Sequence, residues 1–359
     1  MSPEQARPVR LANLHKRFGG FVALENLSLD IEAGEFLTFL GPSGCGKTTT
    51  LKIVAGLLTQ ESGEIYFGER RIDTLPPSRR NIGLVFQNYA LFPHMTVREN
   101  IAFGLRMRRW PAARQAERVE EMLALVRLQG MGNRKPEQLS GGQQQRVAVA
   151  RALAFSPDLV LLDEPLSNLD AKLREEVRLD LRNIQRQSHQ TTVFVTHDQI
   201  EALVMSDRIV LMNSGRIEQI GSPQMLYDEP ATEFAARFVG ANNLVPARLE
   251  VVNGEAAART GSDVHVRLNT VVPGLADGAD IWMCVRPENI HIITGEGSSD
   301  GSGATVLDMI FQGTTVLVDL ESDGLGSLRA EVPARHVAGI AAGQRVGLTF
   351  AAAHAVPRS

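Results

Sequence analysis

One stretch, Gly41–Thr48, constrains this chain more than any other feature. It reads Gly-Pro-Ser-Gly-Cys-Gly-Lys-Thr and fits the pattern G-x-x-x-x-G-K-[ST]. An apolar run of strand length, residues 35–40, precedes it, and residues 49–58 follow with the apolar spacing of a helix. A strand, a glycine-rich turn and a helix in this order let backbone N–H groups surround a phosphate. We therefore expect Lys47 to reach the β- and γ-phosphates of a nucleotide and Thr48 to offer its hydroxyl to Mg²⁺. The alternative, a glycine-rich turn that binds nothing, gives no reason for a lysine directly after Gly46.

Three further apolar runs end in polar residues. Residues 159–162 form a buried, parallel-type strand that is followed by the adjacent carboxylates Asp163 and Glu164. Residues 192–196 are followed by His197, and residues 82–86 by Gln87. Alternation of strands with helices over residues 35–212 predicts an α/β domain around a mainly parallel sheet. Such sheets bind ligands at the carboxyl ends of their strands, where these polar residues are expected.

A second glycine-containing segment opens another expected helix. It begins Leu139-Ser140-Gly141-Gly142-Gln143, with Ser140 at an N-cap position and two glycines that allow close backbone approach. Taken alone, this is another helix start able to hold an anion.

Composition excludes several classes of protein. The 359 residues carry a net charge of −4, which argues against nucleic-acid binding, and no apolar stretch approaches the length of a membrane span. The residues at the start of the sequence lack the basic and apolar parts of a signal peptide. One of only two cysteines, Cys45, lies inside the glycine-rich loop, so a disulfide framework is not expected.

The last third of the chain changes character. After a helical connector, residues 222–238, the sequence turns to short β-rich runs with many glycines. A weak repeat relates residues 274–288 to residues 339–350, which suggests a small barrel-like domain. We therefore expect two domains, residues 1–238 and residues 239–359.

Together these motifs resemble the ATP-binding subunit of an ABC transporter. Gly41–Thr48 matches the family's Walker A motif, Gln87 its Q-loop and residues 139–143 its LSGGQ signature. Asp163 and Glu164 match Walker B with its catalytic glutamate, Ser167–Asp170 the D-loop and His197 the switch histidine. The fold implied is a P-loop NTPase (ABC ATPase) domain followed by a small all-β, OB-like (TOBE-type) domain, because Val285-Arg286-Pro287-Glu288 matches a TOBE motif.

The resemblance implies a role for each site residue. Two copies face head to tail, so that the signature of one caps the γ-phosphate held by Lys47 of the other. Glu164 is implied as general base, with His197 and Gln87 also catalytic, and Mg²⁺ is implied at Thr48, Gln87 and Asp163. Phe18 aligns with the aromatic that stacks on the base, although a packed hairpin phenylalanine is the alternative. The implied ATP contacts are Phe18, Gly41, Pro42, Ser43, Gly44, Cys45, Gly46, Lys47, Thr48, Thr49, Ser140, Gly141, Gly142 and Gln143.

The resemblance also implies partners, a location and a cargo class. These are two integral-membrane permeases, a solute-binding protein and a second copy of this chain, at the cytoplasmic face of the inner plasma membrane. Residues 81–96, 103–107 and 238–244 look like polyamine-type importers. Iron(III), phosphonate and sugar importers remain alternatives, as does a soluble, non-transport ABC ATPase. An exporter ATPase is disfavoured by the β-rich domain. The aromatic and apolar residues after Gln87, namely Tyr89, Leu91, Phe92 and His94, are expected to be exposed and to dock a permease helix.

Overall fold

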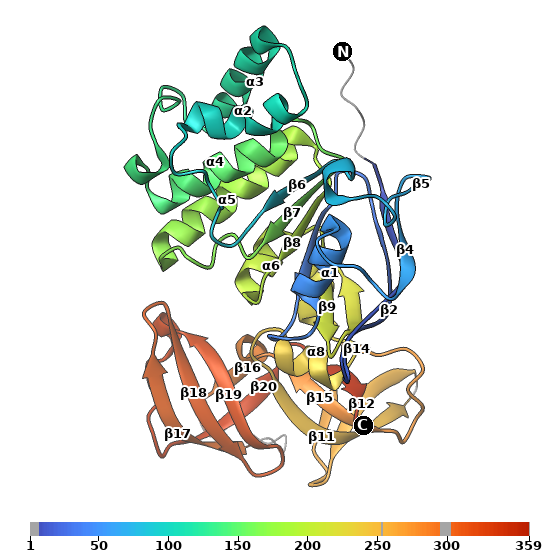
Figure 1. Cartoon of the computed structure of the whole chain (residues 1–359). Helices are drawn as coiled ribbons and strands as arrows, with labels where there is room; N and C mark the ends of the chain where they lie inside the picture. Colours follow the sequence, from blue (N-terminus) through green and yellow to red (C-terminus); the bar gives the residue numbers. More distant parts are fainter. Residues whose placement is uncertain (1–6, 253, 295–302, 359) are drawn as a thin grey trace. The chain divides into compact units, whose positions relative to one another are not determined.

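The computed structural model describes residues 7–252, 254–294 and 303–358. The chain forms two compact units, Met1–Pro223 and Gln224–Ser359 (Figure 1). No helix in the described ranges is both long and apolar enough to cross a bilayer.

A six-stranded sheet in the order β10-β9-β3-β8-β7-β6 forms the centre of the first unit. Five of its strands pair in parallel, and β10 runs antiparallel to β9 at one edge. The strands are β3 (Phe36–Leu40), β6 (Ile82–Val85), β7 (Leu159–Asp163), β8 (Thr192–Val195), β9 (Arg208–Asn213) and β10 (Arg216–Gly221). Every residue of β3 and β8 is buried, as expected for a sheet covered on both faces. The segments after β3, β6, β7 and β8 therefore meet along the carboxyl edge of the sheet, where all four expected polar segments begin.

A second, antiparallel sheet covers one side of this unit, in the order β2-β1-β4-β5 (Figure 1). Its strands are β1 (Val9–Phe18), β2 (Phe21–Ile31), β4 (Ser62–Phe67) and β5 (Arg70–Arg71). Helix α1 (Lys47–Ala55) packs in the same core as both sheets, through Leu51, Ile53 and Val54. The glycine-rich loop is thereby held between two sheets.

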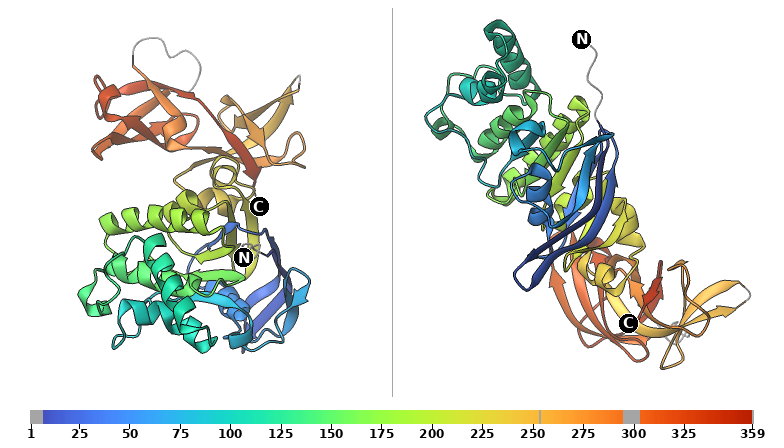
Figure 2. Two further views of the ribbon diagram at one scale, coloured as in Figure 1. Left: turned by 90° about the horizontal axis from the view of Figure 1, so that it is seen from above. Right: turned by 45° about the vertical axis from the view of Figure 1, so that its right-hand side comes forward.

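The remaining helices of the first unit pack around a second core on the other face of the central sheet. They are α2 (Val97–Met107), α3 (Ala112–Leu125), α4 (Gly141–Leu153), α5 (Ala171–Ser188) and α6 (Gln199–Met205). Two short 3-10 turns, η1 (Pro77–Arg79) and η2 (Pro136–Gln138), lie in connecting segments. Helices α2 and α3 lie together beside α4 in both views (Figures 1 and 2). Val119, Met122 and Leu123 on α3, and Val126 directly after it, are buried.

The second unit contains two sheets. One is six-stranded, in the order β13-β12-β11-β15-β21-β14, and the other is five-stranded, in the order β16-β20-β17-β18-β19. Their strands are β11 (Asn243–Val252), β12 (Glu255–Thr260), β13 (His265–Arg267), β14 (Thr270–Val271), β15 (Asp280–Val285), β16 (Ile290–Ile293), β17 (Gly303–Phe311), β18 (Thr315–Ser322), β19 (Gly326–Pro333), β20 (Arg345–Phe350) and β21 (His354–Pro357), with η3 (Pro287–Asn289) and η4 (Ala334–His336). The two repeated segments give β15 in one sheet and β20 in the other.

Arg286 fastens the connector to these sheets. The connector consists of two short helices, α7 (Pro223–Asp228) and α8 (Glu233–Phe238), separated by Pro230. The buried Arg286 side chain donates through Nε to the carbonyl of Tyr227 (3.1 Å) and through Nη1 to those of Val239 (2.6 Å) and Ala241 (2.9 Å). Residues 224–238 thus belong to the second unit by packing, although the expected boundary lies after residue 238. The expected boundary between the two domains stays a prediction.

Candidate functional site

The glycine-rich loop connects β3 to α1, and its glycines are required by the backbone. Gly46 has φ +108°, and a Cβ there would lie 2.7 Å from the carbonyl oxygen of Ala23. A Cβ on Gly41 would lie 2.3 Å from the carbonyl oxygen of Met212. Gly46 is the N-cap of α1, and because glycine has no side chain, it cannot cap the first N–H groups of the helix. The loop has the form that backbone binding of an anion needs.

Lys47 lies inside this loop. Its side chain is buried, and Nζ donates to the carbonyls of Gly41 (2.7 Å) and Pro42 (2.9 Å) and lies 3.6 Å from the Cys45 sulfur. The ammonium group is thus held within the curl of the loop by neutral partners. A buried cation paired with carbonyls attracts an anion, which is the chemistry expected of this position.

Thr48 and Asp163 come together from separate elements. The Thr48 hydroxyl donates to Oδ1 of Asp163 at 3.4 Å. Burial, and then the negative charge of Glu164, raise the pKa of the Asp163 carboxyl. Mg²⁺ prefers one or two protein oxygens supplemented by substrate phosphates, and this hydroxyl–carboxylate pair fits that preference. In the described ranges no group of three or more His, Cys, Asp and Glu side chains could hold a metal ion. The pair therefore suits a metal that is shared with a phosphate.

Glu164 and His197 lie side by side after neighbouring strands. Asp163 pairs with Val195 in the β7–β8 ladder, and Oε1 of Glu164 is 3.2 Å from Nδ1 of His197. Glu164 has φ +45°, in the left-handed region, and its N–H donates to Val195 (3.0 Å). Such backbone strain concentrates at functional sites. The two side chains line a cavity of about 100 Å³ together with Ser167, Arg174, Thr196, Asp198 and Glu201.

Gln87 is linked to this pair through the segment after Glu164. Its Nε2 donates to the Ser167 hydroxyl at 3.0 Å, and that hydroxyl donates to the Glu164 carbonyl at 2.9 Å. Asn168 donates to the Gln87 carbonyl at 3.0 Å. In the structure the Gln87 amide group thus contacts the D-loop rather than Thr48 or Asp163. The motif match included Ser167, but its contact with Gln87 joins residues 80 positions apart and has no sequence signal.

Ser140 and Gln143 form a capping box at the start of α4. The Ser140 hydroxyl accepts from the Gln143 N–H at 3.4 Å, and Oε1 of Gln143 accepts from the Ser140 N–H at 3.1 Å. Gly142 is buried, and a Cβ there would lie 3.0 Å from both Leu173 and Val177 on α5. This glycine is therefore needed for helix packing. Ser140 is exposed, so its hydroxyl is open to a ligand from outside the chain.

Phe18 is half exposed at the end of β1, in the β1–β2 hairpin. The alternative of a packed hairpin phenylalanine is not supported. Lys16 Nζ lies 5.3 Å from the centre of its ring, the geometry of a cation–π contact.

The loop after Gln87 differs from expectation at one residue. We call residues 88–95 the docking loop. Tyr89 is 7% exposed and belongs to the helical core, so the expectation that it is exposed is wrong. Phe92 is half-buried against Phe103, with ring centres 4.5 Å apart, while His94 is exposed. Of the residues expected at this surface, His94 is exposed and Leu91 and Phe92 are partly exposed; Asn88, Ala90 and Pro93 are exposed beside them.

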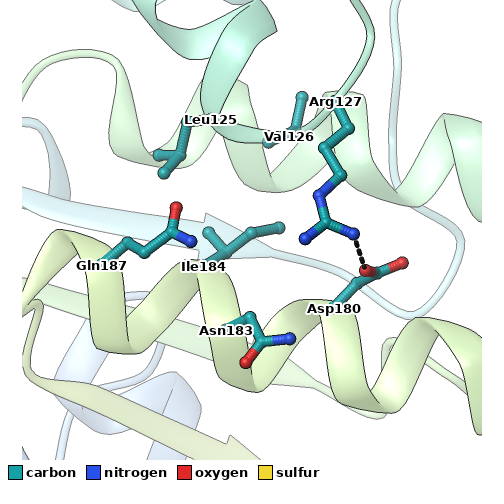
Figure 3. Close-up of a pocket in the computed structure, with 7 residues that line it drawn as sticks. All are labelled: Leu125, Val126, Arg127, Asp180, Asn183, Ile184 and Gln187. Atoms are coloured by element: carbon teal, nitrogen blue, oxygen red, sulfur yellow. Dashed lines mark hydrogen bonds and ion pairs between the residues drawn. The ribbon is translucent and has the colours of Figure 1, made fainter.

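A separate hollow lies between the end of α3 and the middle of α5 (Figure 3). It is lined by Leu125, Val126, Arg127, Asp180, Asn183, Ile184 and Gln187, and it spans about 10 Å³, enough for about one water. Arg127 and Asp180 form an ion pair across it at 3.5 Å. It contains none of the expected site residues.

Two known protein families match parts of this chain. The family described as "ABC transporter" matches residues 24–167, and the one described as "TOBE domain" matches residues 283–357. The first match spans the glycine-rich loop, the docking loop and the Asp163–Glu164 pair.

Individual relatives match nearly the whole chain. A spermidine/putrescine import ATP-binding protein PotA of Rubrobacter xylanophilus is 46% identical over 358 residues, covering 98% of this chain and 94% of its own. An Fe(3+) ions import ATP-binding protein FbpC of Fusobacterium nucleatum is 45% identical over 316 residues, covering 88% of this chain and 84% of its own. Among solved structures, the dimeric post-hydrolysis state of the ATP-binding cassette MJ0796 bound to ADP and Pi aligns with a TM-score of 0.53 and 36% identity. It covers 60% of this chain and 98% of that one.

Proposed function

This chain belongs to the ATP-binding import subunits of ABC transporters, and from that premise we propose that it drives uptake of a polyamine-type cation as one of two identical ATPase subunits. The expected fold, an ABC ATPase domain of the P-loop type followed by an all-β TOBE domain, is confirmed. The permeases, the solute-binding protein and the cytoplasmic face of the plasma membrane belong to the proposal.

The observation that carries the proposal is the meeting of three groups at one sheet edge. The phosphate loop follows β3, Asp163 and Glu164 end β7, and His197 follows β8. Thr48 touches Asp163, and Glu164 lies within hydrogen-bonding distance of His197. An anion site, a pair of oxygens suited to Mg²⁺ and a carboxylate beside a histidine are the parts that phosphoryl transfer to water requires.

We assign the roles as follows. The N–H groups of residues 44–49 and Nζ of Lys47 bind the phosphates, and Thr48 with Asp163 would hold Mg²⁺. When bound there, the metal would supply positive charge against the charge that develops on the phosphate oxygens. Glu164 accepts a proton from the attacking water through its carboxylate. His197 donates Nδ1–H to Oε1 of Glu164 and so orients the carboxylate.

Gln87 and the signature segment complete the site. The Gln87 amide can exchange its bond with Ser167 for one with Mg²⁺ or water, because the residue is exposed. Ser140, with Gly141, Gly142 and Gln143, presents an exposed hydroxyl and a helix N-terminus to the phosphate bound by the second copy. Phe18 stacks on the base, since its ring is half exposed. ATP then holds the two copies together until it is hydrolysed.

The cargo follows from kinship alone. Of the relatives described, one at 46% identity is a polyamine import subunit and one at 45% is an iron(III) import subunit. The higher coverage of the first, 98% against 88% of this chain, favours a polyamine. Iron(III) uptake is the second candidate.

Glu164→Gln tests the chemistry. The substitution preserves size and removes the charge that accepts the proton, so we expect ATP binding to persist and turnover to fall by roughly 10²–10⁴. Asp198→Asn is a matched control, because Asp198 lines the same cavity but caps α6. Purified Glu164→Gln protein with turnover near that of the wild type would remove Glu164 from the role of base.

A further inference from the structure

Arg151, near the end of α4, binds the docking loop. Its Nη1 donates to the carbonyl of Ala90 at 2.7 Å and its Nη2 to the carbonyl of Tyr89 at 2.9 Å. The guanidinium carbon lies 5.6 Å from the centre of the Phe92 ring. One side chain thus contacts three residues of the loop, about 60 positions away in the sequence.

The backbone at these two carbonyls is strained. Tyr89 has φ +61° and Ala90 φ +46°, the left-handed region, which non-glycine residues rarely adopt singly and more rarely in succession. In addition, the buried Tyr89 hydroxyl finds no hydrogen-bond partner within the described ranges. A strained loop relaxes unless other contacts hold it. The two hydrogen bonds from Arg151 therefore stabilise the strained conformation of Tyr89 and Ala90.

The Arg151 side chain is half-buried. Desolvation lowers the pKa of its guanidinium. Its hydrogen-bond partners are the neutral carbonyls of the docking loop. Because both bonds go to carbonyls of residues in the left-handed region, they favour a role for Arg151 in positioning the loop backbone.

A second anchor holds the other end of the loop. Asn100 on α2 is fully buried; its Oδ1 accepts from the Phe92 N–H at 2.9 Å, and its Nδ2 donates to the carbonyls of Phe92 and Met95 at 3.2 Å. Asn100 ties the loop to α2, the helix that follows the loop in the sequence, whereas Arg151 ties the loop to α4.

We propose that Arg151 is a positioning residue that couples the signature segment to the docking loop. Helix α4 begins after Ser140 and runs without interruption to Leu153. Because an α-helix is stiff over this length, about 16 Å from Ser140 to Arg151, a displacement of the Ser140 end reaches the carbonyls of Tyr89 and Ala90 directly. The coupling rests on the proposed function, since it requires that Ser140 engages nucleotide and that the loop engages a permease.

Hydrogen exchange of the full-length chain tests the clamp without a permease. The reporting amides are those of Tyr89, Ala90, Phe92 and Met95, which donate to Phe86, Asn88, the Asn100 side chain and Phe92, respectively. Arg151→Gln should raise their exchange about tenfold or more, the effect of losing a charge-assisted hydrogen bond. Arg151→Lys keeps a hydrogen-bond donor and should give an intermediate exchange rate. This variant also allows the test if Arg151→Gln does not fold.

Arg118→Gln is the matched control. Arg118 on α3 also donates to backbone carbonyls at the end of α4, those of Ala154 (2.9 Å) and Leu153 (3.4 Å), but not to the docking loop. It should leave loop exchange unchanged. If Arg151→Gln changed loop exchange by less than about twofold, or no more than Arg118→Gln does, the clamp would be refuted.

The second measurement uses the importer purified with its own permeases in nanodiscs. The ratio of ATPase activity with the permeases to that of the isolated chain should fall in Arg151→Gln, recover in part in Arg151→Lys and stay at the wild-type value in Arg118→Gln. Faster loop exchange with an unchanged ratio would overturn the coupling role. If the wild-type importer hydrolysed no ATP, the proposed function would fail, while loop exchange would still decide the clamp.

Discussion

Replacing Arg286 by methionine should unfold the second unit at lower temperature. Arg286 supplies the donors for the carbonyls of Tyr227, Val239 and Ala241, and it stacks on the Tyr227 ring at 3.9 Å. Each buried carbonyl left without a donor costs about 1–3 kcal/mol. Burial of the Arg286 guanidinium lowers its pKa, which shows that burying this charge has a cost. Methionine removes that cost, and this offsets part of the loss of stability. We expect a net loss of about 2–4 kcal/mol, or about 10 °C in the melting temperature of a unit of this size.

Tryptophan fluorescence can isolate this unit. The chain has two tryptophans, Trp110 in the first unit and Trp282 in the second, so Trp110→Phe leaves a single reporter. Trp282 donates from Nε1 to Glu233 on α8 at 2.8 Å and so reports whether the connector is in place. Arg248→Met is the control, because Arg248 is exposed and its ion pair with Asp280 is worth about 0.5 kcal/mol. A Trp282 melting temperature within about 2 °C of the wild type in Arg286→Met would refute the reasoning.

Three further outcomes are expected. His354 bridges Thr270 Oγ1 (2.6 Å) and the Pro230 carbonyl (2.8 Å), with Glu229 and Arg286 nearby. Burial lowers the pKa of this histidine, so the folded state binds the proton less readily than the unfolded state does. The second unit should therefore lose stability as pH falls below about 6.5, and denaturant melts of His354→Gln should lack this part of the pH dependence. Phe92→Asp should abolish assembly with the permeases in a pull-down, since the half-buried ring lies on the loop surface. His15→Asp, on β1, is the control. Normal assembly of Phe92→Asp would place docking elsewhere. A chain that ends after Pro223 should bind ATP in calorimetry and be better folded than one that ends at Ala241, because the latter keeps α7 and α8 without Arg286; equal solubility of the two would contradict this.

The parallel sheet and its edge could be predicted because the signals are local. Strands buried on both faces are continuous apolar runs, and each is followed directly by the polar residue that the site uses. The pairing of Glu164 with His197 then follows from adjacent parallel strands. Helix α1 begins at Lys47 rather than at the expected residue 49, because Gly46 with φ +108° is where the loop backbone turns into the helix.

The features that the sequence did not predict depend on contacts between distant segments. Tyr89 lies in a loop-like stretch, and its burial depends on the helical core that closes over it. The bonds of Arg151 to residues 89 and 90 and of Arg286 to residues 227, 239 and 241 also join separate segments. The split of the connector into α7 and α8 had a local signal in Pro230, since proline lacks the N–H that an uninterrupted helix needs.

Uptake by proteoliposomes containing the complete importer tests the central claim most directly. Labelled spermidine or putrescine should accumulate when ATP is supplied on the side of this subunit, and accumulation should fall by roughly 10²–10⁴ with Glu164→Gln. Excess iron(III) should not compete. ATP-dependent accumulation of iron(III) without polyamine uptake would contradict the proposed cargo, and uptake that persists in Glu164→Gln would contradict the proposed ATP-driven mechanism.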